Sequence, residues 1–153
     1  MNHLTITKVL SFALILFLMP LFSSAGSDGE QNAGIQFHNG SWKEVLEKAK
    51  KENKLIFVDA YAVWCGPCKW MDANVFPQRE VGDFYNSKFI NFKIDAERGE
   101  GRTFSQDYRV TAFPTFLFIN PEGEVVHRTM GAKPPNVLIE EGRRALQIGA
   151  ASR

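Results

Sequence analysis

A short apolar run followed closely by two cysteines decides the fold of this chain. It reads LIFVDAY over residues 55–61 and VWCGPCK over residues 63–69. The run predicts a buried β-strand because it is short, mostly apolar and preceded by polar Asn53 and Lys54. A helix is expected to start at Cys65, since Pro67 suits the first helical turn, where backbone N–H groups have no intrahelical partner. The stretch therefore predicts a strand, a turn, and a helix that carries both cysteines at its N-terminal end.

The position of Cys65 predicts a reactive thiol. A thiol at a helix N-terminus faces unpaired N–H groups and the positive end of the helix dipole, and both favour the thiolate. The pKa of Cys65 is therefore expected to fall from about 8.5 toward neutrality, which makes it a nucleophile. Cys68 lies one turn further along the same helix face, where it can close a disulfide with Cys65. The pair predicts dithiol–disulfide exchange.

The first 25 residues are typical of a secretory signal peptide. Lys8 precedes an apolar run over residues 9–22, and Ser23-Ser24-Ala25 offers small residues for cleavage after Ala25. A transmembrane anchor is the alternative, but about fourteen apolar residues interrupted by Pro20 fall short of the ~20 needed to span a bilayer. No cysteine stands near the cleavage site, so no lipid anchor is expected. The sequence predicts an exported protein, periplasmic or extracellular.

Composition and charge limit the domain count and the class of partner. The chain has 153 residues, of which 44% are hydrophobic, enough for the core of one domain. Residues 26–34 are expected to be a flexible lead-in, and residues 35–148 the folded domain. Lys8 is the only charged side chain in residues 1–25, so the remainder carries 17 basic and 17 acidic side chains. This balance gives no sign of nucleic-acid binding.

A structural disulfide and a zinc site are the alternatives to a redox role for the cysteine pair. A structural disulfide is disfavoured because a separation of three residues closes too small a loop to stabilise the fold much. A structural zinc site needs four ligands. After residue 25 only His38 and His127 could join the cysteines, and neither has the spacing of a ligand pair. No metal is therefore expected.

Three motifs together resemble the thioredoxin family. They are Trp-Cys-Gly-Pro-Cys-Lys at 64–69 after a strand that carries an aspartate, Ala-Phe-Pro-Thr at 112–115, and Met-Gly-Ala at 130–132. The resemblance covers roughly residues 34–146. The stretch over residues 74–95 is similar to exported thioredoxin-like proteins and to the C-terminal domain of DsbD thiol:disulfide interchange proteins. The resemblance implies an α/β thioredoxin fold, with a mixed central sheet and helices on both faces.

The resemblance also implies acids behind the cysteines. Asp59 matches the family's buried acid, and a carboxyl group in apolar surroundings has a raised pKa, so it could take the proton from Cys68. The alternative is a polar residue at a strand end. The lysine that thioredoxins pair with this acid falls at Asn91, and Lys93 is the possible substitute. Asp72 matches a second acid of the DsbD C-terminal domain, but it can equally be a polar residue near a helix end.

The remaining site residues are expected to bind the substrate. Pro114 matches the family's cis-proline, which brings its loop against Cys65 and lets the backbone of Phe113 pair with an extended substrate strand. Trp64, with Tyr61 beside it, is expected to form an apolar rim around the thiol. Gly66 and Pro67 complete the predicted binding surface between the cysteines.

The function expected from these residues is an exported thiol:disulfide oxidoreductase that reduces protein disulfides. The resemblance links the Gly-Pro pair between the cysteines to reducing members of the family. The partners expected are disulfide-containing proteins and a membrane thiol reductant of the DsbD type, with no cofactor beyond the Cys65–Cys68 disulfide. The alternatives are a disulfide oxidase or isomerase, and a peptide-binding, chaperone-like module whose redox pair is incidental.

Hydrophobic periodicity and turn residues predict the other elements. The expected helices begin at Ser41, at Cys65 (ending near Asn74), at residue 79 (to 86), at residue 103 (to 108) and after Pro134-Pro135. The expected strands are 35–37 as a short edge strand, 55–61, 89–95, 115–119 as a central strand, and 124–130 as the hairpin partner of that strand. The polar stretch 96–102 is expected to be a solvated loop.

Overall fold

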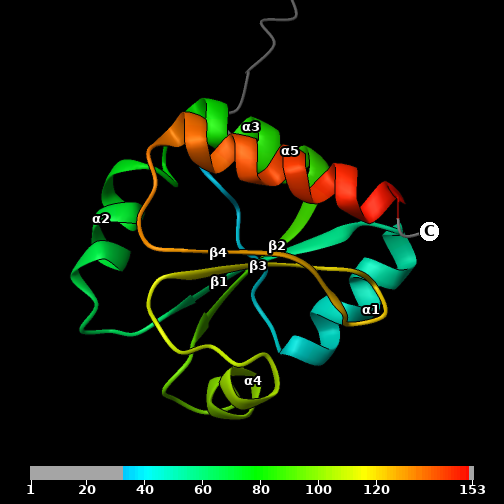
Figure 1. Ribbon diagram of the computed structural model, residues 1–153, viewed down its shortest axis with the longest axis horizontal. Coiled ribbons are helices and arrows are strands. Elements are labelled where there is room, and N and C mark those ends of the chain that lie inside the picture. Colours follow the sequence, from blue (N-terminus) through cyan, green and yellow to red (C-terminus); the bar gives the residue numbers. More distant parts are fainter. Residues whose placement is uncertain (1–32, 152–153) are drawn as a thin grey trace, which may run out of the picture.

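The computed structural model describes residues 33–151 and contains a four-stranded sheet flanked by five helices (Figure 1). The strands are β1 (Leu55–Tyr61), β2 (Phe89–Asp95), β3 (Thr115–Ile119) and β4 (Val125–Met130). The helices are α1 (Trp42–Glu52), α2 (Gly66–Asn74), α3 (Arg79–Lys88), α4 (Gly101–Asp107) and α5 (Pro135–Ala151). The expected signal peptide and most of the expected lead-in lie outside the described residues.

The sheet is mixed, with strand order β2-β1-β3-β4. β1 pairs in parallel with β2, while β3 runs antiparallel to both β1 and β4. Strand β3 is buried along its whole length because it lies inside the sheet and both its faces are covered. This arrangement confirms the fold expected from the resemblance.

Helices cover both faces of the sheet, as Figure 1 shows. Side chains of a strand point alternately to its two faces. On β1, Ile56, Val58 and Ala60 pack in one core with residues of α1 and α4. Leu55 and Phe57 pack in the other core, with residues of α2, α3 and α5. Asp59 follows these two in the alternation, so its carboxyl group lies on the α2 side of the sheet.

Helix boundaries follow the capping residues that the sequence indicates. Ser41 caps α1 in a complete capping box with Glu44, and Asn53 ends this helix in the left-handed conformation, with φ 50°. Cys65 is the N-cap of α2, and this helix ends at Asn74, as expected. Helix α3 starts at Arg79 as expected but runs to Lys88, two residues beyond its predicted end.

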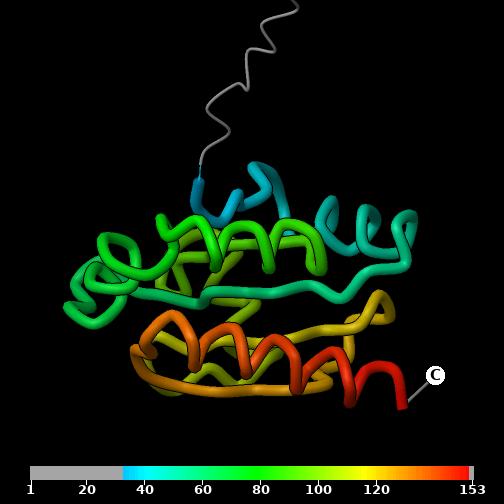
Figure 2. Tube along the Cα trace, turned by 90° about the horizontal axis from the view of Figure 1, so that it is seen from above, coloured from blue at the N-terminus to red at the C-terminus, as the bar shows by residue number. Residues whose placement is uncertain are grey.

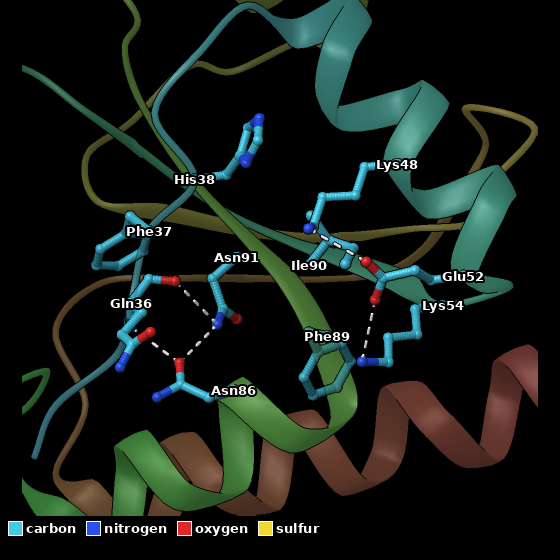
Figure 3. A pocket seen from close by; sticks show the side chains of 10 residues that line it. All are labelled: Gln36, Phe37, His38, Lys48, Glu52, Lys54, Asn86, Phe89, Ile90 and Asn91. Carbon is cyan, nitrogen blue, oxygen red and sulfur yellow. Dashed lines mark hydrogen bonds and ion pairs between the residues drawn. The ribbon is translucent and has the colours of Figure 1, made fainter. Parts of the chain in front are cut away.

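The expected edge strand over residues 35–37 is not formed. The Ile35 N–H donates to Phe76 O (2.8 Å) and the His38 N–H to Asn91 O (2.8 Å), so the segment divides its hydrogen bonds between two parts of the chain. Side-chain amides hold it as well. Asn86 Oδ1 accepts from the Gln36 N–H at 2.9 Å, and Asn91 Nδ2 donates to that oxygen at 3.0 Å (Figure 3). Figure 2 shows the segment lying alongside α3.

The helix expected at residues 103–108 begins two residues earlier, at Gly101. A Cβ at Gly101 would lie 1.8 Å from the Asp95 carbonyl oxygen, so only glycine allows this close approach to the end of β2. The stretch before it is not the wholly solvated loop that its charges predict. Ala96 is buried, and Glu97 and Glu100 accept hydrogen bonds from Trp64 and Trp42. Within residues 33–151, none of the helices is long and apolar enough to cross a membrane.

Candidate active site

The two cysteines form a disulfide at the N-terminus of α2, with an S–S distance of 2.07 Å. Cys65 Sγ accepts a hydrogen bond from the Cys68 N–H at 3.1 Å, so the sulfur occupies the N-cap position that stabilises negative charge. Gly66 and Pro67 between them are exposed. Both cysteines are only 2% exposed and pack with Ala62, while Tyr61 and Phe113 lie against this group.

Asp59 is a buried acid on the same strand that leads to the cysteines. It is 1% exposed, and its Oδ2 accepts a hydrogen bond from Lys93 Nζ at 2.7 Å. Its other oxygen, Oδ1, has no hydrogen-bond partner within the described residues. Burial raises the pKa of Asp59 from 3.8 to about 6, although the Lys93 charge opposes this shift. An acid with this pKa can both accept and release a proton near neutral pH.

Lys93 takes the place of the lysine that the resemblance puts at Asn91. It lies directly opposite Asp59 in the parallel β1–β2 register, which brings the two side chains to the same face. Its ammonium group also lies over the Tyr61 ring, 4.6 Å from the centroid, and near the Phe76 ring at 5.2 Å. Asn91 instead binds the segment before α1.

Lys93 links Asp72 to the buried acid, Asp59. Lys93 Nζ donates a hydrogen bond to Asp72 Oδ1, so one ammonium group bridges two carboxyl groups. Desolvation alone would lower the pKa of Lys93, but the two carboxylates outweigh it and raise the pKa. The side chain of Asp72 is 44% exposed and that of Lys93 21%, and both line an open pocket of about 410 Å³. Asp59, Lys93 and Asp72 thus connect the core to solvent.

The loop before β3 has the expected cis peptide bond, between Phe113 and Pro114. The Gly131 N–H donates to Pro114 O at 2.9 Å, which joins the loop to the end of β4. Phe113 contacts the cysteine cluster, and its ring lies edge-on to the Trp64 ring, with centroids 5.8 Å apart. The structure therefore brings Trp64, Phe113 and Pro114 together beside Cys65.

One residue of this surface was not found from the sequence. Glu97 Oε2 accepts a hydrogen bond from Trp64 Nε1 at 2.8 Å. Glu97 belongs to a polar stretch with four charged residues in the seven from 96 to 102, so neither hydrophobic periodicity nor a motif distinguishes it from its neighbours.

Two other features lie apart from this chemistry. A pocket of about 310 Å³ lies at the start of β2, at the opposite end of the parallel strands from the cysteines (Figure 3). Glu52 pairs there with Lys48 (3.1 Å) and Lys54 (3.2 Å). Within residues 33–151 no three His, Cys, Asp or Glu side chains gather as a metal site.

The fold and this site define a class of protein that exchanges thiols and disulfides through two cysteines at a helix start. A family model described as a thioredoxin-like domain matches residues 42–145. Thioredoxin H7 of Arabidopsis thaliana is 36% identical over 104 residues, which cover 67% of this chain and 75% of the relative. The chain belongs to the thioredoxin-like family and is a thiol:disulfide oxidoreductase.

Solved structures agree with this assignment. A candidate disulphide-isomerase from Bacteroides thetaiotaomicron is 43% identical, with a TM-score of 0.67 over 76% of this chain and 96% of that one. The oxidised C-terminal domain of DsbD from Neisseria meningitidis has a TM-score of 0.59 over 73% of this chain and 99% of that one. It is 23% identical, so this likeness shows the fold alone.

Proposed function

We propose that this protein is exported and reduces disulfide bonds in other exported proteins. The observation that carries the proposal is the Cys-Gly-Pro-Cys pair at the start of α2, placed after a strand whose buried acid has a pKa of about 6. The signal-peptide pattern of residues 1–25 supports export. The neutral Gly66-Pro67 pair supports the reducing direction, because it adds no charge that would stabilise the Cys65 thiolate beyond the effect of the helix terminus.

The reaction proceeds in two exchanges. The Cys65 thiolate attacks one sulfur of the substrate disulfide, a mixed disulfide forms, and the other substrate sulfur leaves as a thiolate. Cys68 then loses its proton to the Asp59 carboxylate and attacks Cys65 Sγ. The Cys65–Cys68 disulfide forms and the second substrate sulfur leaves as a thiolate, so two electrons pass from the protein to the substrate.

The oxidised protein then has to be reduced again. Outside the cytosol disulfides persist because the environment is oxidising, so we propose that a membrane thiol reductant of the DsbD type supplies the two electrons.

Disulfide isomerisation is the second function to consider. It is favoured by the 43% identity to the candidate disulphide-isomerase. An isomerase has to rearrange incorrect disulfides into the correct ones, whereas a reductase leaves the substrate cysteines as free thiols.

Equilibration with glutathione and two activity assays separate these functions. A reductase should have a reduction potential nearer to that of thioredoxin, about −270 mV, than to that of protein disulfide isomerase, about −180 mV. It should reduce insulin and should not restore activity to scrambled ribonuclease. The opposite pattern would assign isomerisation. A Cys65→Ser variant that kept full biological activity would instead favour a peptide-binding role.

A further inference from the structure

Helix α4 ends in a tight turn that leads directly into the loop over residues 111–114. Arg109, the second residue after the helix, has the left-handed conformation, with φ 51°. Its N–H donates to Gln106 O at 3.3 Å, and the Val110 N–H donates to Ser105 O at 2.9 Å. These two bonds are those of a Schellman motif, a common helix ending. The turn therefore sets the point at which the chain enters the loop.

The left-handed residue of this turn is an arginine, where a Schellman motif usually has glycine. A residue with a Cβ is strained in this conformation, because the Cβ comes close to the following carbonyl oxygen. Such strained residues persist only where the surrounding structure holds them. Contacts from outside the turn are therefore needed to keep Arg109 in place.

Arg128 of β4 supplies these contacts. Its Nη1 donates to Arg109 O at 2.9 Å, and its Nη2 donates to Tyr108 O. Tyr108 is the C-cap residue of α4, and carbonyl groups at a helix end lack partners within the helix. One guanidinium group thus satisfies two neighbouring carbonyl oxygens with its forked donors, a geometry that the single ammonium group of a lysine does not reproduce.

The pairing of β3 with β4 directs Arg128 toward this turn. Arg128 lies opposite Leu117, whose side chain packs in the core that contains residues of α1 and α4. Because directly opposite residues share a face of the sheet, the side chain of Arg128 lies on the α4 side. The Tyr108 hydroxyl group donates to Gly123 O at 3.1 Å, in the connection between β3 and β4, and so fixes the helix end at a second point.

Strand β4 also holds the other end of the loop. Gly131 follows β4 directly, and its N–H donates to Pro114 O at 2.9 Å. Between the two anchors, Thr111 and Ala112 are exposed and Phe113 is half-buried. A loop that is fixed at both ends has less conformational entropy to lose when an extended chain pairs with its backbone.

We propose that Arg128 is a positioning residue for protein substrates, which holds the turn at Arg109 so that the backbone of Phe113 is ready to pair with a substrate chain. This inference rests on the proposed reduction of protein disulfides. Arg128 donates only to backbone oxygens of the turn, so it acts through the loop and not on the cysteines. A small dithiol has no peptide backbone to pair with the loop, so its exchange with Cys65 does not depend on Arg128.

The first measurement is the single-turnover oxidation of the reduced full chain by insulin at increasing insulin concentration. Arg128→Met keeps an apolar stem but removes both donors. It should raise the half-saturating insulin concentration about fivefold, which corresponds to ~1 kcal/mol of binding free energy, and leave the saturating rate nearly unchanged. Arg128→Lys keeps the charge without the forked donors and should show most of the same loss. Reduction of the oxidised Arg128→Met chain by dithiothreitol should proceed at the wild-type rate.

Arg109 provides a test that general loss of structure would not satisfy. Glycine adopts a φ of 51° without strain, so a turn with glycine at this position needs less support. Arg128→Met should therefore have a smaller effect on the half-saturating concentration in the Arg109→Gly background than in wild type. Arg144→Met is the matched control, because it removes the same charge from an exposed position on α5 and should change neither measurement.

Hydrogen exchange of the oxidised chain reports on the anchor directly. The Val110 and Gly131 amides, each hydrogen-bonded at 2.9 Å, should lose protection in Arg128→Met. The Val75 amide, hydrogen-bonded at 3.0 Å at the end of α2, should keep its protection.

Four results would each overturn the inference. They are unchanged protection of Val110 and Gly131, a dithiothreitol rate that falls together with the insulin reaction, wild-type behaviour of Arg128→Lys, and an equal effect of Arg128→Met in the Arg109→Gly background. If wild type does not reduce insulin at all, the proposed reductase function fails. Hydrogen exchange then still decides whether Arg128 holds the loop.

Discussion

At the scale of single residues, the central feature is one ammonium group shared by two carboxyl groups. Lys93 opposes the effect of burial on Asp59, while the charge of Asp72 acts in the opposite sense. Burial is the largest influence on the pKa of Asp59, and the way in which Lys93 is shared between the two carboxylates adjusts that pKa further. Sharing makes Asp59 a weaker acid than it would be with the lysine to itself.

Substitutions of the two partners should move the pH profile of resolution in opposite directions. Lys93→Met removes the charge that favours ionised Asp59, so its pKa should rise above about 6 and the rise in rate should move to higher pH. Asp72→Asn removes a charge that repels ionised Asp59, so the pKa of Asp59 should fall and the rise in rate should move to lower pH. Stopped-flow measurement of mixed-disulfide resolution from about pH 5 to 9, a range that spans the pKa of Asp59, would record both profiles.

Asp59→Asn is the reference for this pair, because it should remove the inflection altogether. Shifts of the same sign in the Lys93 and Asp72 variants would contradict the shared-lysine arrangement. An unchanged profile in Asp59→Asn would show that Asp59 is structural.

The two thiols of the reduced protein should differ in reactivity. Cys65 occupies the N-cap of α2, where the helix N–H groups stabilise its thiolate, while Cys68 lies inside the first turn. Iodoacetamide near neutral pH should therefore alkylate Cys65 much faster, as mass spectrometry of quenched digests would show. Equal rates, or faster labelling of Cys68, would refute the assignment of Cys65 as nucleophile.

At the scale of elements, α3 and the segment before α1 are fitted closely to each other. A Cβ at Gly82 would lie 2.3 Å from Ala33 O and 2.6 Å from Gly34 O. These are backbone atoms, which cannot turn aside as a flexible side chain can. The segment also carries Phe37, which packs edge-on against Phe76 with ring centroids 5.4 Å apart. The segment that packs against Gly82 therefore also contacts Phe76, whose ring lies near the Lys93 ammonium group.

Gly82→Ala should release the segment from α3. The Ile35 and His38 amides, each hydrogen-bonded to the rest of the domain at 2.8 Å, should lose protection in hydrogen exchange. The unfolding free energy should fall by about 1–3 kcal/mol, as in other overpacked sites. Gly66→Ala is the control, since nothing lies within 4 Å of its Cβ position, and it should leave both amides protected. If both amides stayed protected in Gly82→Ala, the segment before α1 would have moved aside for the added methyl group without a loss of stability.

At the scale of the whole molecule, the folded chain keeps an acid buried that water would solvate. The pKa of Asp59 is about 6 in the folded state, against an ordinary value of 3.8. The folded protein therefore binds this proton more tightly than the unfolded chain. The stabilisation that results is fully present below about pH 4 and is lost as the pH rises through about 6. Its size is on the order of 3 kcal/mol.

Asp59→Asn should therefore stabilise the oxidised protein near pH 7.5 more than near pH 4, because it removes the cost of the buried negative charge. Urea unfolding at the two pH values would measure the difference. Asp83→Asn changes an exposed carboxyl group and should show no such dependence. If the stability gap between Asp59→Asn and wild type were the same at both pH values, the raised pKa would be wrong.

Much of the molecule could be predicted from the sequence, because the signals are local. Short apolar runs identified β1 and β3, apolar alternation identified β2, the capping box fixed the start of α1, and the Cys-Gly-Pro-Cys pattern placed α2 and its disulfide. These features depend on backbone geometry and on neighbours within one or two turns. The errors arose where a distant part of the chain decided the outcome. Residues 35–37 bind two separate parts of the chain instead of forming a strand, and α4 begins at Gly101, which lies so close to the end of β2 that no Cβ would fit.

Only the tertiary structure decided how the site is assembled. The sequence offered Asn91 and Lys93 as partners of Asp59, and the parallel β1–β2 register selected Lys93. The sequence left two interpretations of Asp72, as a second acid or as a polar residue near a helix end. The packing of α2 brought its carboxyl group to the ammonium group of Lys93. Glu97 had no signal at all, because a charged loop residue acquires a partner only when a distant Trp64 is folded against it. Local sequence determined the cysteine pair and its helix, whereas contacts between segments more than twenty residues apart determined what surrounds them.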